Sequence, residues 1–292
     1  MQAIKISKLS KRYGSQPALS DVSFNVEAGE VYGFLGPNGA GKTTTIRCLM
    51  DFIRPDSGTI SVFGLDAQRD SVQVKRRVGF LSADDQLYDK WNAKQHIAFI
   101  SSVRGGTDNS SRLMSRLDLD PQVPVRHLSS GNQQKLGLVL ALMSNPKLLV
   151  LDEPTKGLDP LLQHEIYAIL KEYVTKGGTV FLSSHNLAEV EHICTHVGVI
   201  RQGQIVASQS LQQILAMNVH IVTVSFRALD QPPRISLPGV EVVSASSHHL
   251  VLKARGDINP LIAKLSTFKL TDVEIAHAPL EDIFMEYYRG QS

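Results

Sequence analysis

Eight residues near the N-terminus have the spacing of a phosphate-binding loop. The segment GPNGAGKT, residues 36–43, has glycines at its first, fourth and sixth positions and ends in Lys42 and Thr43. Glycines let backbone N–H groups turn towards an anion, and a helix N-terminus behind them adds a favourable dipole. The lysine would reach the β- and γ-phosphates of a nucleotide, and the threonine hydroxyl would bind Mg²⁺. The loop therefore predicts a nucleotide site.

Two carboxylates follow an apolar segment farther along the chain. In KLLVLDEP an expected strand, residues 148–151, is followed by Asp152 and Glu153. With the lysine loop upstream, Asp152 would hold the Mg²⁺ shell and Glu153 would polarise a water for in-line attack on the γ-phosphate. A solvated strand end is the alternative for such a pair. The apolar run GGTVFLSSH delivers His185 to a loop, where we predict a γ-phosphate contact rather than a structural histidine.

A third segment, LSSGNQQK at residues 128–135, looks like a phosphate-binding loop. It lacks the lysine that such a loop usually carries. Two hydroxyls, a glycine and an amide run directly into an expected helix. Ser129 or Ser130 would serve as an ordinary helix N-cap, which is the simpler interpretation of the segment by itself. The N-terminus of a helix also attracts an anion. The sequence thus leaves open whose phosphate this segment would hold.

The ordered set of Tyr13, the lysine loop, LSSGNQQK, LLVLDEP, GLDP and SSHN resembles the ATP-binding cassette family, the motor subunits of ABC transporters. The resemblance covers roughly residues 1–220 and implies ATP and Mg²⁺ as cofactors. In that family the segment matching 128–135 completes the site of a second cassette in a head-to-tail dimer. The resemblance therefore implies that Ser129 and Gly131 contact the γ-phosphate of a partner chain, whose own Lys42 supplies the lysine.

Other site residues follow from the resemblance one position at a time. Tyr13 would stack on adenine, with a half-buried strand tyrosine as the alternative. Asp159 would lie at the dimer seam, a role compatible with a helix N-cap before Pro160. The catalytic assignments are Lys42, Glu153 and His185, and the metal ligands are Thr43 and Asp152. The nucleotide-binding assignments are Tyr13, Gly36, Pro37, Asn38, Gly39, Ala40, Gly41, Lys42, Thr43, Thr44, Ser129, Ser130, Gly131, Asn132 and Asp159.

The chain departs from the family pattern at three positions. Ser130 and Asn132 stand where glycine and glutamine are usual, and both exchanges keep the chemistry of a helix start. In RRVGFLSADDQLYDKW, Ala83 takes the place of a glutamine that contacts Mg²⁺ and the attacking water. Either the contact is missing and turnover is slower, or a neighbour supplies it. The neighbours that could do so are Asp84, Asp85 and Gln86.

The elements that position these motifs follow from the hydrophobic pattern. VYGFLGPNGAGKTTTIRCLM indicates strand, loop and helix. Apolar residues at helical spacing predict a helical subdomain over about residues 84–146, with a loop at 105–109. There Tyr88 and Trp91 would pack in the core or line a groove for a membrane subunit. The resemblance implies an α/β fold, a P-loop NTPase with a RecA-like core and antiparallel β and helical subdomains.

A change in composition marks a second domain after the cassette, which we place at residues 1–220. Residues 221–292 begin with alternating apolar and polar positions that predict three short strands, and INPLIAKLSTF predicts a helix. This is a small C-terminal α+β domain. Its tail, APLEDIFMEYYRG, resembles the tail of efflux-type cassettes that work with separately encoded permeases.

Composition limits the classes of function. The 292 residues are 42% hydrophobic with a net charge of +2, so charge gives no case for a nucleic-acid partner. No apolar run approaches the length of a membrane span. We expect the ATPase motor of an ABC exporter, a homodimer of cassettes when ATP is bound, attached through a permease to the cytoplasmic face of the membrane. An importer motor is the alternative, followed by a soluble ATPase associated with nucleic acid or ribosomes.

Overall fold

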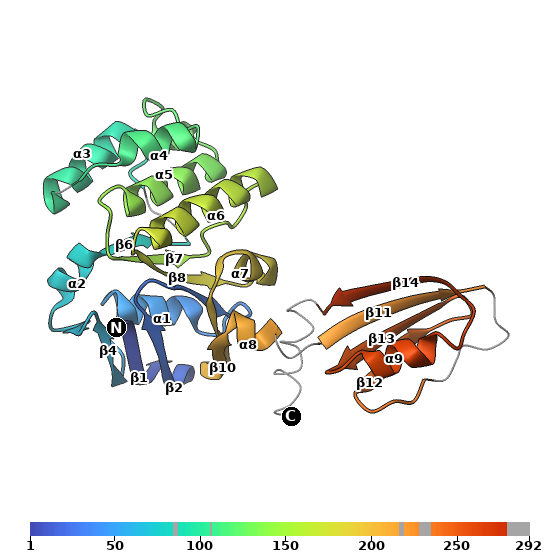
Figure 1. Cartoon of the computed structure of the whole chain (residues 1–292). Helices are drawn as coiled ribbons and strands as arrows, with labels where there is room; N and C mark the ends of the chain where they lie inside the picture. Colours follow the sequence, from blue (N-terminus) through green and yellow to red (C-terminus); the bar gives the residue numbers. More distant parts are fainter. Residues whose placement is uncertain (84–86, 106, 216–218, 228–234, 279–292) are drawn as a thin grey trace. The chain divides into compact units, whose positions relative to one another are not determined.

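The computed structural model describes residues 1–83, 87–105, 107–215, 219–227 and 235–278 (Figure 1). The chain forms two compact units, Met1–Gln209 and Ser210–Ser292. The boundary we expected at residue 220 falls inside the second unit, within the first strand of its sheet.

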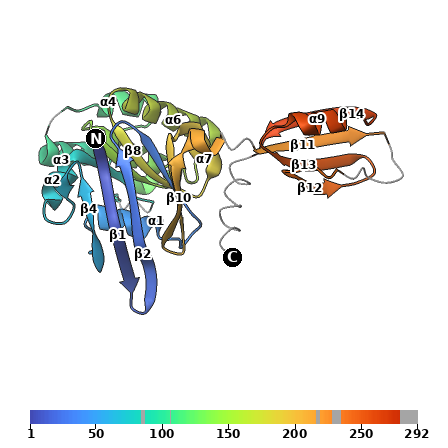
Figure 2. The ribbon, with the colours of Figure 1, turned by 60° about the horizontal axis from the view of Figure 1, so that its bottom comes forward.

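The first unit contains an antiparallel sheet with the strand order β2-β1-β4-β5. Figure 2 shows the two long strands β1 and β2 side by side, with β4 next to β1. Polar and apolar residues alternate along β2, and the apolar ones face the core. The strands are β1 (Gln2–Tyr13), β2 (Gln16–Glu27), β4 (Ser57–Val62) and β5 (Leu65–Asp66).

A second sheet carries the expected nucleotide motifs, and its order is β10-β9-β3-β8-β7-β6. Strands β9, β3, β8, β7 and β6 run parallel to one another. Every residue of β3, β7 and β8 is buried, as expected for a sheet covered on both faces. The strands are β3 (Val31–Leu35), β6 (Val78–Leu81), β7 (Leu148–Asp152), β8 (Thr179–Ser184), β9 (His196–Arg201) and β10 (Gln204–Ser210).

Helix α1 (Lys42–Leu49) lies between the two sheets and contacts β2 and β7 (Figure 1). Four aromatic rings fill the adjoining core: Phe24, Tyr32, Phe34 and Phe181 pack with centroid separations of 5.1–5.9 Å. Because β3, β7 and β8 are parallel neighbours, their carboxyl ends meet at one edge of the sheet. The lysine loop, Glu153 and His185 follow these three ends.

Three helices, α3 (Ala93–Arg104), α4 (Ser110–Arg116) and α5 (Ser130–Leu142), follow β6 within the residues expected for the helical subdomain (Figure 1). Asn92 and Gln95 form a capping box at the start of α3, and α3 ends at Arg104, where the expected loop begins. A 3₁₀ turn at Val125–His127 precedes α5. The helices outside this subdomain are α2 (Ser71–Arg77), α6 (Pro160–Thr175) and α7 (Leu187–Ile193).

The second unit is a sheet of order β12-β13-β11-β14 with a helix and its own apolar core. Its first three strands and the helix within INPLIAKLSTF match the expected pattern. The structure adds β14, whose alternating sequence LTDVEIAH we did not assign to a strand. The elements are α8 (Leu211–Leu215), β11 (Val219–Phe226), β12 (Val240–Ala245), β13 (His249–Arg255), α9 (Asn259–Leu265) and β14 (Leu270–His277). The tail from residue 279 onwards lies outside the described residues.

Candidate functional site

A cavity of about 460 Å³ opens where the carboxyl ends of β3, β7 and β8 meet. It brings together the lysine loop, the residue after the acidic strand end and His185, as the sequence predicted. Gly36 and Ala40 of the loop are buried beneath it. The lining residues are Ala18, Pro37, Asn38, Gly39, Gly41, Lys42, Thr43, Thr44, Ala83, Glu153, Lys156 and His185.

Two glycines shape the loop for different reasons. Gly41 precedes α1 with a φ of 113°, a left-handed conformation that other residues rarely adopt. It has no side chain to cap the helix, so the first N–H groups of α1 are available to an anion. Gly36 is required by space, because a Cβ atom there would lie 2.4 Å from the carbonyl oxygen of Ile200. The loop is thus a preformed anion cradle.

The two expected metal ligands touch each other. Thr43 Oγ1 donates a hydrogen bond to Asp152 Oδ2 at 3.0 Å, and the hydroxyl of Ser183 donates to Asp152 Oδ1. Asp152 is 1% exposed, so these bonds compensate for its burial. A hydroxyl and a carboxylate side by side beneath a phosphate cradle are the oxygen donors that Mg²⁺ prefers. The residues present therefore fit Mg²⁺.

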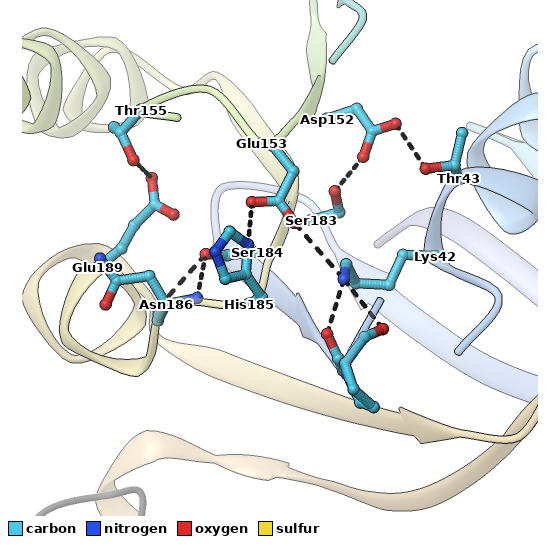
Figure 3. Close-up of polar contacts among 12 residues, drawn as sticks. Lys42, Thr43, Asp152, Glu153, Thr155, Ser183, Ser184, His185, Asn186 and Glu189 are labelled. Carbon is cyan, nitrogen blue, oxygen red and sulfur yellow. Dashed lines mark hydrogen bonds and ion pairs between the residues drawn. The ribbon is translucent and has the colours of Figure 1, made fainter. Parts of the chain in front are cut away.

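Glu153 lies between a lysine and a histidine (Figure 3). Its Oε2 is 2.7 Å from Nδ1 of His185, and its Oε1 is 3.4 Å from Nζ of Lys42. Lys42 also donates to the carbonyl oxygen of Gly36 at 2.6 Å. The backbone of Glu153 is left-handed, with a φ of 53°, which costs a non-glycine residue about 1 kcal/mol or more. The surrounding contacts hold the carboxylate in a conformation that it would not adopt alone.

The LSSGNQQK segment lies outside this cavity. Ser129 caps α5 by accepting a bond from the backbone N–H of Asn132 at 3.3 Å, while Ser129 and Ser130 are exposed. Gly131 packs near Leu158, whose Cδ2 would be 3.4 Å from a Cβ at that position. Asp159 is the N-cap of α6 and accepts from the N–H of Leu162 at 2.9 Å. Ser129 and Asp159 are therefore helix N-caps in this chain, and both residues are exposed to solvent.

Three other positions refine the sequence-based picture. Tyr13 is half-exposed at the end of β1 and is not part of the cavity lining. Ala83 does line the cavity, as expected for the position it occupies, whereas Asp84, Asp85 and Gln86 lie outside the described residues. Lys156 lines the cavity too. We did not single it out, although it stands three residues after Glu153.

Sequence reasoning also missed Glu189, a carboxyl group buried beside the site. Glu189 is 1% exposed and accepts a hydrogen bond from Thr155 Oγ1 at 2.9 Å (Figure 3). Burial raises the pKa of this carboxyl group, and hydrogen bonds from Ser184 and Thr155 partly oppose the shift. Because Glu189 lies in the first turn of α7 and bonds Thr155, it ties the start of α7 to the residues that follow Glu153.

Comparisons with known proteins agree with this geometry. A family model described as ABC transporter matches residues 19–156. The Nod factor export ATP-binding protein I of Ralstonia nicotianae is 32% identical over 97% of this chain and 92% of its own length. The chain belongs to the ABC transporter family. It is an ATP-binding cassette subunit and an ATPase, as its motifs implied.

Other cassettes match a smaller share of the chain. The bacitracin transport ATP-binding protein BcrA of Bacillus licheniformis is 37% identical over 69% of this chain and 68% of its own. A solved ATP-binding subunit of an ABC transporter superposes with a TM-score of 0.69 at 29% identity, over 73% of this chain and 92% of that one. These matches confirm the P-loop fold of this ABC cassette. Among its described residues, no helix is long and apolar enough to cross a membrane.

Proposed function

We propose that this cassette is the motor subunit of an exporter, coupling MgATP hydrolysis to a separate membrane permease. The observation that carries the direction of transport is the alignment with the Nod factor export protein, which spans 97% of the chain and thus both units. The lantibiotic transport protein SrtF of Streptococcus pyogenes, 34% identical over 70% of this chain and 89% of its own, also supports it.

The site residues have complementary roles in hydrolysis. Lys42 would bind the β- and γ-phosphates, together with the N–H groups at the start of α1. Glu153 would accept a proton from the water that attacks the γ-phosphorus, and ADP would leave in line. His185 would hold Glu153 and contact the γ-phosphate. Bound Mg²⁺, held by Thr43 and Asp152, would offset negative charge on the phosphate oxygens.

Two chains would form two shared sites. Ser129 and Gly131 do not line the cavity of their own chain, yet they present an exposed helix N-terminus that suits an anion. In a head-to-tail dimer they would meet the γ-phosphate held by the Lys42 of a second copy. Asp159 would lie at the same seam, and Tyr13 would stack on adenine. The exposed positions of Ser129, Asp159 and Tyr13 support this arrangement, and Gly131 is partly exposed.

A surface of the helical subdomain suits a membrane partner. Tyr88, Trp91 and Phe99 form an aromatic cluster, with the Trp91 ring 4.5 Å from Tyr88 and 5.8 Å from Phe99. Tyr88 is 58% and Phe99 48% exposed, so this apolar area is open to a partner. We assign it to the permease, which would keep the chain at the cytoplasmic face of the membrane. We assign no nucleic-acid partner.

A pull-down from membranes tests this proposal. Tagged Glu153→Gln would be purified from gently solubilised membranes with MgATP, beside an untagged control. We expect a stoichiometric polypeptide with several membrane spans. Ribosomal protein or nucleic acid without a permease would contradict the transporter assignment. If transport requires an extracellular binding protein, the direction of transport is import, and the chain is an importer motor.

A further inference from the structure

Three glutamine side chains of the first unit make the same kind of contact. Each donates from Nε2 to two backbone carbonyl oxygens. Gln133 of α5 binds the carbonyls of Val125 and Leu128, both at 3.3 Å. Its partners thus lie in the helical subdomain, just before the segment that caps α5.

Gln134, the next residue, reaches a different part of the chain. Its Nε2 donates to the carbonyl oxygen of Pro154 at 3.1 Å and to that of Glu153 at 3.4 Å. We call residues 153–159 the catalytic turn. The turn also bonds internally, because the N–H of Lys156 donates to the carbonyl of Glu153 at 3.2 Å. Gln134 therefore acts on the peptide unit that sets the direction of the Glu153 side chain.

The backbone of Glu153 makes this contact consequential. At a φ of 53° it is in the left-handed region, which persists only where neighbouring groups hold it. Gln134 of α5 stabilises this conformation by its bonds to the carbonyls of Glu153 and Pro154. Gln163 of α6 holds the far end of the turn, by bonds to the carbonyls of Leu158 at 3.0 Å and Thr155 at 3.4 Å. Gln134 belongs to α5, which begins at Ser130, whereas Gln163 belongs to α6, which begins at Pro160.

Helix α5 begins at the segment that we assign to the nucleotide of the partner chain. Gln134 lies three residues after Gly131, on the first turns of the same helix. Gly131 itself packs near Leu158 of the catalytic turn. A shift of α5 caused by a phosphate at Ser129 would thus move the carbonyl bonds of Gln134, within a single rigid helix.

We propose that Gln134 is a positioning residue that couples the two shared sites. It sets the backbone of Glu153 in its own chain according to whether α5 has engaged the nucleotide of the partner. Glu153 is then aligned for hydrolysis only when the neighbouring site is filled. This inference rests on the shared-site dimer of the proposed function, and it adds a route by which one site senses the other.

The test compares Gln134→Met with two matched variants of the full chain. Gln133→Met removes two bonds of the same kind from the same helix, but none to the catalytic turn. Gln163→Met loosens the other end of the turn, by removing bonds from α6 to the carbonyls of Thr155 and Leu158 and none to Glu153. All three keep side-chain length and lose the amide donor. Turnover, KM and the Hill coefficient for MgATP are measured for each variant. Dimer formation with MgATP is measured separately, with each substitution combined with Glu153→Gln.

We expect the wild type to show a Hill coefficient between 1 and 2, the limit set by two sites. Gln134→Met should lower kcat about tenfold and reduce the coefficient to 1, with KM within about twofold, because misplacing one reacting group by a fraction of an ångström is costly. Gln133→Met should stay within about twofold in kcat. Gln163→Met should lower kcat but keep cooperativity.

The outcomes distinguish failure of the role of Gln134 from failure of the proposed exporter motor. In the Glu153→Gln background, Gln134→Met should still dimerise with MgATP, because Ser129 and Gly131 are intact. Normal turnover and cooperativity in Gln134→Met, with dimerisation retained, would overturn the role of Gln134 and leave the exporter motor standing. A Hill coefficient of 1 for the wild type would also overturn the role of Gln134. Failure of Glu153→Gln to dimerise at all would remove the shared sites and this inference together.

Discussion

Nδ1 of His185 lies 2.7 Å from Oε2 of Glu153, although 32 residues separate them in the chain. The register of two parallel strands produces this contact: Asp152 of β7 pairs with Ser183 of β8, Glu153 follows Asp152 directly, and His185 lies two residues after Ser183. The second oxygen of Glu153 faces Lys42 at 3.4 Å. The base, the lysine and the histidine therefore form one connected group.

Removing the imidazole should impair the chemical step more than binding. His185→Ala leaves Glu153 without the partner that orients it, so we expect kcat to fall about 100-fold with little change in the Kd of ATP. Steady-state kinetics and equilibrium binding measure the two effects. His192→Ala, on the helix α7 that follows His185, is the control and should remain near wild type. A loss confined to binding would contradict the role of His185.

The hydroxyl of Thr43 should determine the requirement for Mg²⁺. Thr43→Val keeps the shape but removes the donor to Asp152 and the oxygen ligand, whereas Thr43→Ser keeps both. We expect the Mg²⁺ concentration for half-maximal ATPase to rise about tenfold in Thr43→Val and to change little in Thr43→Ser. A titration of ATPase rate against Mg²⁺ measures it. Equal behaviour of the two variants would exclude Thr43 as a ligand.

Ala83 lines the cavity with a methyl group, at the position where the sequence resemblance implies a glutamine. Ala83→Gln should therefore raise kcat by about two- to fivefold, because an added amide can orient the attacking water. Ala83→Leu adds similar bulk without polar atoms and should give no gain. If Ala83→Gln alters neither the ATPase rate nor its Mg²⁺ dependence, the position has no part in turnover.

Glu189 should make stability depend on pH. Burial raises the pKa of its carboxyl group above the ordinary value of 4.5, so the folded state keeps a proton that the unfolded chain has released. This contribution to stability is fully present below pH 4.5 and is lost as pH rises through the raised pKa. Glu189→Gln keeps an acceptor for Thr155 and does not titrate.

Thermal unfolding across pH checks this expectation. The Tm of Glu189→Gln should match that of the wild type near pH 4 and exceed it by a growing margin as pH rises. Glu191→Gln, an exposed neighbour on α7, should show no such divergence. A constant difference at every pH would mean that Glu189 titrates alike in the folded and unfolded chain.

Much of this site was predictable because motifs mark the ends of buried strands. Apolar runs before Gly36, Asp152 and His185 indicated strands. The structure shows that these strands are parallel neighbours, and parallel neighbours gather their carboxyl ends at one edge of a sheet. The contact of Gln134 was not predictable, since its acceptors are backbone carbonyls and every residue carries one. Glu189 was hidden for a related reason: only the fold shows that a charged residue near a helix start is 1% exposed.

The behaviour of Glu153→Gln with MgATP tests the central claim most directly. The amide keeps the size of the side chain but cannot accept the proton of the attacking water. We predict that hydrolysis falls at least about 100-fold while the purified chain, monomeric without nucleotide, becomes a stable ATP-loaded dimer by light scattering. Hydrolysis at the wild-type rate, or an ATP-bound chain that remains monomeric, would contradict the account.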